Sequence, residues 1–461
     1  MKALPMDINL SFWNSPEGAS LLHSAKEKLS LSNNDTLRAG TLLRKQFSAL
    51  PPERIAAALE CILLREKAAL FGEWTQRGFF TKQSLEQAST PRIAEHHATC
   101  FRGRKHLVEI CTGLGFDTAA LARVVGRITT IEADAELAAL ARHNLAAQGI
   151  HNVEVIEGRA EDILPNMGAS SIDALWSDPS RRNPHGCRIE NPDEYLPSLA
   201  FVQKYVENHV EKYVENHVEN HVENRVEKYV ENCVGNGVNN LQLPFYAGIK
   251  IAPAANLTAL HLQGWKREWI GAGVGGGQSA ECREQTLWWG LQDDVLVDGR
   301  VSLPEIGAMW QPSAGAASRA FQECSPTSLQ DLNDWYCCEP HPCLIRSGYL
   351  AEFFRERGIA MLDKHIAYGI SPQKPEASLW YQTFRILEAF SFHRARLKER
   401  VLARGWGKSV EIKKRGFPET PDEIRKWLKL PQQGTGGVVI IARIGAGASN
   451  EHLVMLAERL R

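Results

Sequence analysis

The sequence predicts an α/β protein: a central parallel sheet, preceded by a helical region and followed by small α+β modules. From residue 106 onward, short β-rich runs alternate with helical stretches: HLVEIC, DTAALARVV, ITTIEA, ELAALARHNLAAQG, VEVIEG, IDALWSD and GIKIAPA. Strand, helix and strand in this rhythm predict right-handed βαβ units. Upstream, LRAGTLLRKQF and ERIAAALECILLREKAALF carry apolar residues at helical spacing.

The chain of 461 residues is longer than one typical domain. We predict a helical region over 1–95, the α/β domain over 96–303, a small α+β module over 304–375 and a last module over 376–461. The last module is predicted to contain, in order, a helix in FRILEAFSFHRARLKERVLARG, a strand in SVEIKKRGF, a helix in TPDEIRKWLKL capped by Thr420, and a closing strand in GVVIIARIG.

The net charge, the cysteines and the apolar stretches indicate which partners and which cellular compartment to expect. A formal net charge of -1 means that a polyanionic partner would need a locally basic region. The ten cysteines lack the dense spacing of a disulfide framework, so we expect a reducing, cytoplasmic environment. No stretch approaches the roughly 18 apolar residues of a membrane span, and the N-terminus lacks the apolar core of a signal peptide.

Residues 204–240 form a tetrapeptide repeat with valine at every fourth position from 206 to 238. Because a spacing of four exceeds the 3.6 residues of a helical turn, the valines drift around a helix. The repeat could be a coiled-coil or docking helix, but we favour a low-complexity insert in a surface connection. Its deletion is then expected to leave folding and activity intact.

The first predicted strand of the sheet runs into a glycine-rich turn, VEICTGLGFDT, at residues 108–118. Gly113 and Gly115 allow the backbone to pass close to a ligand at the start of a helix, and Glu109 supplies a carboxylate at the strand end. A dinucleotide fingerprint would need glycine at position 118, where Thr118 stands. A cradle for pyrophosphate is therefore disfavoured.

Further acids follow the next two predicted strands. Glu132 lies 23 residues after Glu109 (132 − 109), about where a carboxylate binds ribose hydroxyls at the end of a second strand. Glu161 and Asp162 follow the third strand and suit an adenine amino group. Three successive strand ends thus offer groups that match a ligand with an ammonium, a ribose and an adenine.

This series resembles the class I S-adenosylmethionine-dependent methyltransferases over roughly residues 104–290, although Cys111 stands where many members have their first glycine. The resemblance implies S-adenosyl-L-methionine as cofactor and a Rossmann-like sheet. The cofactor-binding residues that it implies are Glu109, Cys111, Gly113, Gly115, Asp117, Thr118, Glu132, Ala160, Glu161 and Asp178.

The segment SDPSRR, residues 177–182, follows the fourth predicted strand. In the family this position holds the Asp-Pro-Pro-Tyr type of motif, which positions the methyl acceptor. Asp178 and Pro179 keep its first half, whereas Ser180 and Arg181 replace the second proline and the aromatic ring. The motif therefore does not by itself predict methylation of a base amine. We assign Asp178, Pro179 and Arg181 to catalysis and Arg182 to substrate, since paired arginines can bind phosphate or carboxylate. The alternative is a turn pinned by Asp178 with its arginines in internal salt bridges.

The segment YCCEPHPC contains Cys337, Cys338, His341 and Cys343. Their spacing fits no standard pairing of zinc ligands, so we predict the entry of a helix and expect no metal.

Several segments together resemble a bacterial methyltransferase family with a ferredoxin-like module and a THUMP-like C-terminal domain. They are TGLGFDT, DPSRR, EPHPCLIRSGYLAE, LDKHIAY and VEIKKRGFPETPDEIRKWLKL. THUMP domains in other enzymes bind RNA, so the resemblance implies an RNA substrate by analogy.

The charge of the last module independently agrees with an RNA partner. Residues 385–429 hold 13 Lys or Arg against 6 Asp or Glu, a balance of +7. Phe417, Trp427 and Trp406 are interleaved with these cations, as suits backbone phosphates and exposed bases. We assign Lys413, Lys414 and Arg415 to the substrate. A solvated basic face is the alternative.

The sequence therefore predicts an S-adenosylmethionine-dependent methyltransferase that acts on RNA. Two alternatives stay open: a methyltransferase for a small molecule or a protein, and a non-catalytic RNA-binding protein on a methyltransferase scaffold.

Overall fold

The computed structural model describes residues 10–168, 172–182, 187, 189–217, 245–255, 257, 264–276, 280–290, 299–313, 329–445 and 451–460. Its contacts divide the chain into two compact units. The first contains residues 1–251, 256–265 and 287–292, and the second contains 252–255, 266–286 and 293–461. Each unit is described by itself below.

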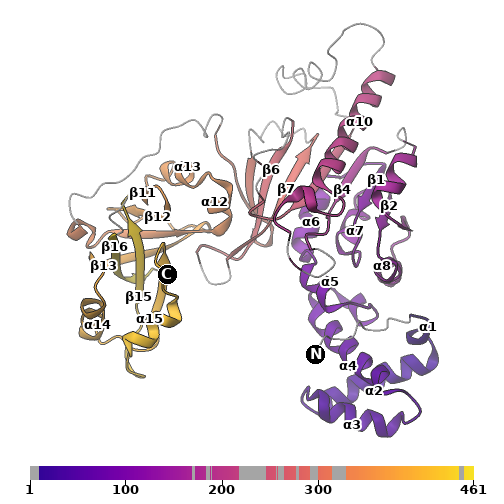
Figure 1. The fold of residues 1–461 in the computed structure, drawn as a ribbon, viewed down its shortest axis with the longest axis horizontal. Coiled ribbons are helices and arrows are strands. Elements are labelled where there is room, and N and C mark those ends of the chain that lie inside the picture. Colours follow the sequence, from indigo (N-terminus) through magenta and orange to yellow (C-terminus); the bar gives the residue numbers. More distant parts are fainter. Residues whose placement is uncertain are drawn as a thin grey trace. The chain divides into compact units, whose positions relative to one another are not determined.

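The first unit begins with a group of helices, as predicted (Figure 1). Ser15 and Asp35 cap two of them by accepting hydrogen bonds from backbone N–H groups of the first turn. Buried leucines such as Leu21, Leu43 and Leu59 form their common core. The elements before the sheet are α1 (Leu10–Trp13), α2 (Pro16–Leu31), α3 (Thr36–Gln46), α4 (Pro52–Lys67), η1 (Ala68–Phe71), η2 (Glu73–Gln76), α5 (Lys82–Gln87) and α6 (Pro91–Thr99).

All five predicted β-rich runs form strands, and β3, β2, β1, β4 and β5 lie side by side with parallel neighbours. The strands are β1 (His106–Ile110), β2 (Arg127–Glu132), β3 (Val153–Glu157), β4 (Ala174–Ser177) and β5 (Tyr246–Ile251). Because β1 is followed by β2 on one side and flanked by β4 on the other, the strand order reverses between β1 and β4. Ligands of open α/β sheets bind at such a switch point, outside the carboxyl ends of the strands.

The connections of this sheet are helical. They are α7 (Phe116–Leu121), α8 (Ala135–Ala147), α9 (Ala160–Ile163), η3 (Leu164–Asn166), η5 (Pro192–Glu194) and α10 (Leu199–His217). The complete sheet has nine strands in the order β3-β2-β1-β4-β5-β7-β6-β8-β9. Of the further elements, β6 (Lys266–Ala272), β8 (Gly299–Leu303), η6 (Pro304–Ile306) and β9 (Ala308–Trp310) consist of residues of the second unit. The residues of β7 (Glu281–Trp289) are divided between the two units.

The beginning of the valine repeat belongs to helix α10, and its side chains enter the core. Val206 is fully buried and Val210 is 3% exposed. His209 stacks near Phe245 with ring centroids 4.4 Å apart. Each valine is rotated by about 40° around the helix axis relative to the valine four residues earlier. Two or three consecutive valines therefore still lie on one face of the helix. The prediction of a dispensable surface insert is therefore wrong for residues 204–210, whereas residues 218–240 lie outside the described part.

The second unit contains a seven-stranded sheet in the order β11-β12-β10-β13-β16-β15-β14. Its elements are η8 (Leu329–Leu332), β10 (Tyr336–Pro340), α12 (Pro342–Ser347), α13 (Leu350–Arg355), β11 (Ala360–Asp363), β12 (Ile366–Ser371), β13 (Tyr381–Ser391), α14 (Arg394–Ala403), β14 (Glu411–Arg415), α15 (Pro421–Leu428), β15 (Val438–Ile444) and β16 (Glu451–Arg459). The sheet is continuous across position 375/376, where we predicted a boundary between two modules. That boundary stays a prediction.

Two expectations for the last module are wrong. The segment FRILEAFS is not helical but forms most of β13, which pairs with β10 on one side and β16 on the other. The predicted closing strand, β15, is followed by a further strand, β16, to which it is antiparallel. The strand β14 and the helix α15 are confirmed, and Thr420 caps α15 in a reciprocal capping box with Glu423.

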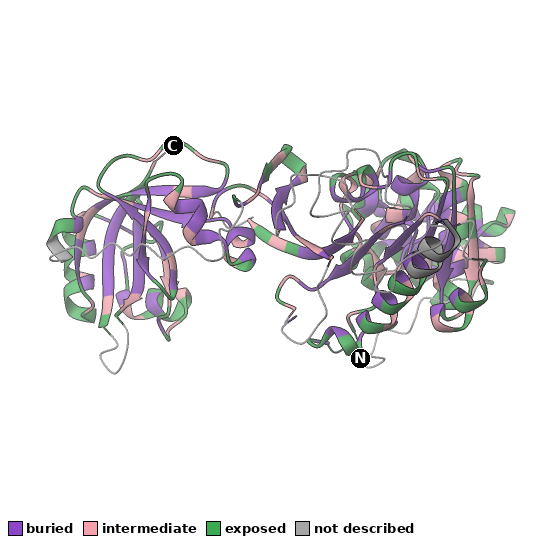
Figure 2. Ribbon diagram, turned by 90° about the horizontal axis from the view of Figure 1, so that it is seen from above, coloured by how far each residue is buried: buried purple, intermediate pink, exposed green. Residues whose placement is uncertain are grey.

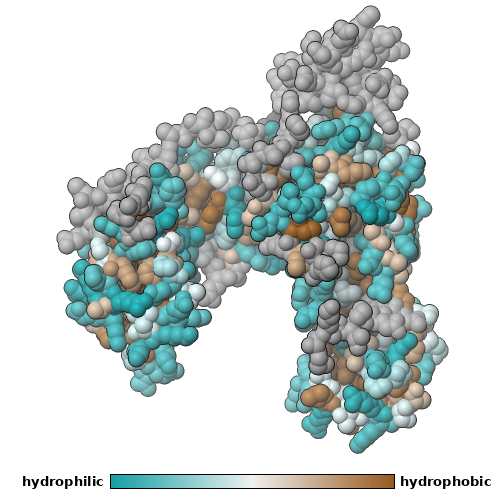
Figure 3. All heavy atoms as spheres, viewed as in Figure 1, coloured by the Kyte–Doolittle hydropathy of each residue, from teal (hydrophilic) through white to brown (hydrophobic). Residues whose placement is uncertain are grey.

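Both faces of this second sheet are covered. Val439, Ile441 and Val454 point to one face, where they pack with buried residues of α14 and α15. Their neighbours Ile440 and Met455 point to the opposite face. Strands of both sheets appear as buried in Figure 2. The helices α14 and α15 therefore have one face on the sheet and carry their polar side chains on the other, and the side of this unit seen in Figure 3 is largely hydrophilic.

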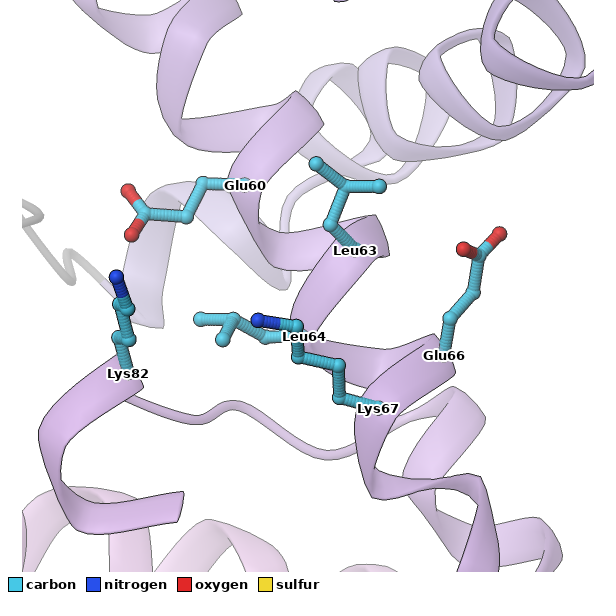
Figure 4. Close-up of a pocket in the computed structure, with 6 residues that line it drawn as sticks. All are labelled: Glu60, Leu63, Leu64, Glu66, Lys67 and Lys82. Atoms are coloured by element: carbon cyan, nitrogen blue, oxygen red, sulfur yellow. The ribbon is translucent and has the colours of Figure 1, made fainter. Parts of the chain in front are cut away.

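A hollow of about 470 Å³ lies in the helical part of the first unit, lined by Glu60, Leu63, Leu64, Glu66, Lys67 and Lys82 (Figure 4). All six residues come from α4 and α5, and none follows a strand of the sheet. We therefore do not place the functional site there. None of the described helices has the length and apolar character that crossing a bilayer requires.

Candidate active site at the strand ends

The glycine-rich turn after β1 has a backbone that few side chains tolerate. Cys111, Gly113 and Gly115 have φ angles of 66°, 56° and 81°, in the left-handed region. A Cβ atom added to Gly113 would meet nothing within 4 Å, so the turn is open on that side. Cys111 adopts a conformation usual for glycine, so the turn keeps this backbone shape without a glycine at that position.

The carboxyl group of Glu109 lies beneath this turn and is only 1% exposed. Thr118 in α7 donates a hydrogen bond of 2.6 Å to its Oε2 atom. Burial raises the pKa of Glu109 to about 8, and the nearby Asp117 and Asp178 add to this, although hydrogen bonds from Thr118 and Thr130 oppose it. Glu109 is thus a buried acid that is hydrogen-bonded to Thr118 and whose pKa lies close to neutral pH.

Glu132, at the end of β2, holds the turn in place. It accepts hydrogen bonds from the backbone N–H groups of Gly113 at 2.9 Å and Asp134 at 3.0 Å. Burial raises its pKa, which these backbone hydrogen bonds partly offset. Two predicted cofactor residues, Gly113 and Glu132, are thus in direct contact although they come from different strands.

Asp178 follows β4 and belongs to a chain of polar side chains. Lys250, at the end of β5, donates to Asp178 Oδ2 at 2.8 Å and to Ser89 Oγ at 3.1 Å. Ser89 in turn donates to Asp117 Oδ2 at 2.8 Å. A buried cation therefore connects the carboxylate after β4 with the carboxylate in the first turn of α7.

His97 of α6 completes this chain. Its Nδ1 atom lies 3.0 Å from Asp117 Oδ1, and its ring packs 4.5 Å from the ring of Trp176. Burial alone would raise the pKa of Asp117, but the hydrogen bond and charge of His97, together with Lys250, lower it to about 2. Both oxygens of Asp117 are thus bonded within the protein, and its contact with a cofactor stays a prediction.

The loop after Asp178 folds back toward the glycine-rich turn. Ser180 exchanges two backbone hydrogen bonds with Leu196, and the thiol of Cys111 donates to the carbonyl oxygen of Leu196 at 3.5 Å. Pro179 is buried, Arg181 is partly exposed and Arg182 is exposed. The predicted catalytic segment therefore lies next to the turn.

The residues predicted after β3 lie at the start of α9. Ala160 is buried, and Glu161 forms an ion pair of 3.2 Å with Arg159. No described hydrogen bond joins either residue to Glu132 or to the glycine-rich turn. Their role at an adenine ring stays a prediction.

The cations predicted to bind substrate in β14 have protein partners. Lys413 lies 2.6 Å from Glu339 and 3.0 Å from Glu411, and its side chain is 9% exposed. Lys414 donates to the carbonyl oxygen of Phe417 at 2.7 Å, and Arg415 lies 3.8 Å from Glu339. Their assignment to substrate stays a prediction, but internal ion pairs already occupy Lys413 and Arg415.

The aromatic residues expected to stack on bases have a different role. Trp406 and Phe417 are each 6% exposed and pack in the core beneath α14 and α15. Partly buried Trp427 packs against the same core and donates to Glu419 at 2.6 Å. The expectation of exposed stacking side chains is therefore wrong for Trp406 and Phe417, which stabilise the module.

The segment YCCEPHPC enters a helix, as predicted. His341 caps α12 by accepting a hydrogen bond from the N–H group of Cys343, and its Nε2 atom lies 3.0 Å from the carbonyl oxygen of Ala272. Within the described ranges, no three His, Cys, Asp or Glu residues are grouped so that they could hold a metal ion.

Sequence reasoning missed Ser89 and His97. Both precede β1, in a segment without a motif, and their partners Asp117 and Lys250 are 20 to 161 positions away. Lys250 was recognisable only as a lysine near the end of a predicted strand. The signal that could have identified it is a lone lysine inside an otherwise apolar predicted strand, GIKIA.

Profiles of three known families match separate parts of the chain. A domain of unknown function matches residues 9–68, protein-L-isoaspartate(D-aspartate) O-methyltransferase matches residues 92–162, and a THUMP domain-like family matches residues 381–459. The methyltransferase match contains the glycine-rich turn, Asp117, Glu132 and Glu161.

Longer similarities cover nearly the whole chain. An uncharacterized S-adenosylmethionine-dependent methyltransferase of Mycobacterium tuberculosis is 26% identical over 404 residues, which are 86% of this chain and 95% of that protein. The crystal structure of a putative methyltransferase from Porphyromonas gingivalis W83 superposes with a TM-score of 0.66 at 17% identity, covering 96% of this chain and 99% of that one. A shorter similarity, 35% over 83 residues, joins 17% of this chain to 18% of a 23S rRNA (uracil(1939)-C(5))-methyltransferase of Acidithiobacillus ferrooxidans.

The fold and these matches define the protein as a class I methyltransferase with a Rossmann-like sheet. The chain is an S-adenosylmethionine-dependent enzyme of this class that carries a THUMP-like C-terminal domain.

Proposed function

We propose that this enzyme transfers a methyl group from S-adenosylmethionine to RNA and that Asp178 positions the acceptor. The observation that carries the assignment of Asp178 is its place at the switch point, 2.8 Å from the buried ammonium of Lys250 and next to the glycine-rich turn. Its carboxylate is 27% exposed, so a substrate can reach it.

The residues around the turn fit the cofactor. Gly113 leaves open space on the side where a Cβ would project, and the carboxyl groups of Glu132 and Asp178 suit a ligand with two positive centres. The buried carboxyl group of Glu109 stays a proposed contact beneath them. Glu132 keeps lone pairs for ribose hydroxyls beyond its backbone hydrogen bonds from Gly113 and Asp134. When bound, the cofactor supplies a methyl group that is already activated by its sulfonium.

The protein's own task is then to orient the acceptor and take up its proton. Lys250 holds the Asp178 carboxylate in one orientation through a charge-assisted hydrogen bond. Asp178 can accept a hydrogen bond from the acceptor atom and receive its proton as that atom is methylated. The folded-back loop carries Arg181 and Arg182, whose guanidinium groups suit a phosphate next to the acceptor.

Three observations support RNA as the substrate. The THUMP domain-like match covers residues 381–459, the most basic part of the chain. One of the similar proteins is named as an rRNA methyltransferase. The helices α14 and α15 carry arginines and lysines on the surface that does not pack on the sheet, as binding to a polyanion requires.

A protein substrate is the second candidate, because the match over residues 92–162 is to a protein-modifying methyltransferase family. That match covers the cofactor turn and the next two strand ends and stops before Asp178, so it does not bear on the acceptor. It therefore supports the cofactor more than the substrate.

Transfer of labelled methyl groups tests the proposal. The full-length protein is incubated with methyl-labelled S-adenosylmethionine and separately with RNA, protein and small-molecule fractions from cells that lack the gene. We expect label in the RNA fraction only, and at least about a hundredfold less with Asp178→Ala. Label in protein alone would replace RNA by the second candidate.

A further inference from the structure

We propose that a hollow at the edge of the second sheet binds phosphate groups of the RNA backbone. The hollow has a volume of about 440 Å³ and is lined by Lys408, Ser409, Val410, Glu411, Arg425 and Arg459. These residues come from the edge strand β14 and the turn before it, from α15, and from the end of β16. This inference rests on the proposed function, since it names the surface by which the THUMP-like domain contacts RNA.

The lining carries three cations and one carboxylate, a balance of +2 (3 − 1). Lys408 is exposed and forms no ion pair among the described residues. Among the residues that the structure describes, Arg425 has an ion pair with Asp422 alone, at 3.2 Å. The Asp422 side chain is 86% exposed, so water weakens the pair. Both cations can therefore turn to a phosphate at little cost.

The single acid of the lining is already neutralised. Glu411 lies 2.6 Å from Arg459 and 3.0 Å from Lys413. Its charge is thus opposed by two cations before any ligand arrives. A phosphate in the hollow faces Lys408, Arg425 and the hydroxyl of Ser409 without an unpaired carboxylate beside it.

The turn that carries Lys408 is fixed in place before RNA binds. Lys408 donates its N–H to the carbonyl oxygen of Pro431 at 2.9 Å, and Gly407 donates to that of Thr435 at 3.0 Å. A Cβ on Gly407 would lie 2.8 Å from the carbonyl oxygen of Gln433, so the two chain segments are in close contact. A preorganised site loses less conformational entropy on binding.

The cationic surface continues beyond the hollow along α15. Lys426 and Lys429 are exposed, and neither forms an ion pair among the residues that the structure describes. By contrast, Lys413 is held by two carboxylates and Lys414 by a backbone carbonyl. The geometry therefore favours the hollow and α15 over the run Lys413 to Arg415 as the phosphate-binding surface.

RNA binding by charge-neutralised variants tests this assignment. Full-length wild type and the double variant Lys408→Ala/Arg425→Ala are titrated into a fluorescein-labelled RNA hairpin at several KCl concentrations. We expect the variant to bind at least about tenfold more weakly and its salt slope to fall by about two, one for each lost phosphate contact. Lys364→Ala/Lys374→Ala removes two exposed lysines of the same unit and should bind like wild type.

The outcomes separate the two proposals. Thermal unfolding of each variant shows whether the fold is kept, and because both mutated side chains of the hollow are exposed, we expect unchanged midpoints. If wild type binds RNA and Lys408→Ala/Arg425→Ala binds equally well, the hollow is not the site. If binding is lost instead with Lys413→Ala/Lys414→Ala, the surface is β14 and this inference is overturned. Absence of RNA binding by wild type would instead remove the proposed RNA substrate.

Discussion

The ammonium of Lys250 lies 2.8 Å from the carboxylate of Asp178, joining the carboxyl ends of two adjacent parallel strands. Lys250 is 2% exposed and Asp178 is 27% exposed. The free-energy cost of burying the ammonium of Lys250 is thus offset by its ion pair with Asp178. The Asp178 carboxylate is itself partly exposed. Removal of one partner is expected to have different effects depending on which one is removed.

Asp178→Ala should lower the free energy of unfolding by roughly 3 kcal/mol, because Lys250 is left in the interior without its main partner. Lys250→Met should cost less, since the remaining carboxylate can be hydrated. The double variant should be more stable than Asp178→Ala alone. Urea unfolding of the three variants measures these differences, and equal, additive losses would contradict the ion-pair account.

Ser89→Ala interrupts the chain of donors between Lys250 and Asp117. Both partners stay buried or partly buried, so we expect a loss of about 1–2 kcal/mol in the free energy of unfolding. Ser20→Ala, at an exposed position of α2, is the matched control and should change stability by less than about 0.5 kcal/mol. An equal effect of both changes, measured by chemical unfolding, would show that the chain contributes nothing.

Glu109→Gln tests the raised pKa of the buried acid beneath the turn. The pKa of Glu109 is about 8 in the folded state against 4.5 for an ordinary glutamate, so its stabilising contribution is complete below 4.5 and is lost as the pH rises through 8. The glutamine variant lacks this loss. Its stability relative to wild type should therefore increase between pH 5 and pH 8.5.

Glu154→Gln provides the control for this pH series, because Glu154 is an exposed residue of β3. The difference in unfolding free energy between that variant and wild type is measured at the same pH values. A Glu109→Gln difference that follows the Glu154→Gln difference at every pH would contradict the raised pKa of Glu109.

Glu132→Ala should weaken binding of S-adenosylhomocysteine by at least about tenfold. The change removes a carboxylate suited to ribose hydroxyls and also releases the N–H group of Gly113. Titration calorimetry gives the dissociation constant without any knowledge of the substrate. Glu136→Ala, an exposed position on the following helix, is the control, and equal affinities of the two variants would contradict the site.

Val206→Ala should destabilise the protein by about 2 kcal/mol, because Val206 is fully buried in the first unit. Val222→Ala, in the part of the repeat that the sequence predicts to be dispensable, should have no measurable effect. Thermal unfolding midpoints of the two variants compare these positions. Equal midpoints would place the whole repeat outside the core.

The sheet of the first unit could be predicted from the sequence because its strands alternate with helices along the chain. The acids Glu109, Glu132 and Asp178, at or near the carboxyl ends of β1, β2 and β4, could be recognised for the same reason, since each stands at the end of an apolar run. The contact between Glu132 and Gly113 follows from the parallel pairing of β1 with β2. Local pattern and three-dimensional position agree at these residues.

The segment FRILEAFS was misinterpreted because its pattern is irregular. The register of β13 against β16 shifts between Ile386 and Glu388, so the alternation of buried and exposed residues breaks there. Apolar residues then recur at a spacing that resembles a helix. The segment forms a strand because it pairs with β10 on one side and β16 on the other. Both partners are distant in the sequence, so the pattern of the segment alone does not show this pairing.

Ser89 and His97 could not be predicted because their roles depend on contacts far apart in the sequence. Ser89 meets Lys250 across 161 positions. At Lys413 a basic run in the sequence predicts a substrate-binding surface, and this assignment stays a prediction, but Glu339 and Glu411 pair with Lys413 in the fold. A count of charges along the chain does not distinguish cations that face water from cations that face carboxylates.

Nucleoside mass spectrometry of cellular RNA tests the central claim most directly. RNA is compared between cells that lack the gene and the same cells that express wild type or Asp178→Asn, each at equal protein level. The account predicts a methylated nucleoside that wild type restores and the variant does not. Identical nucleoside profiles in all three strains, or full restoration by Asp178→Asn, would contradict it.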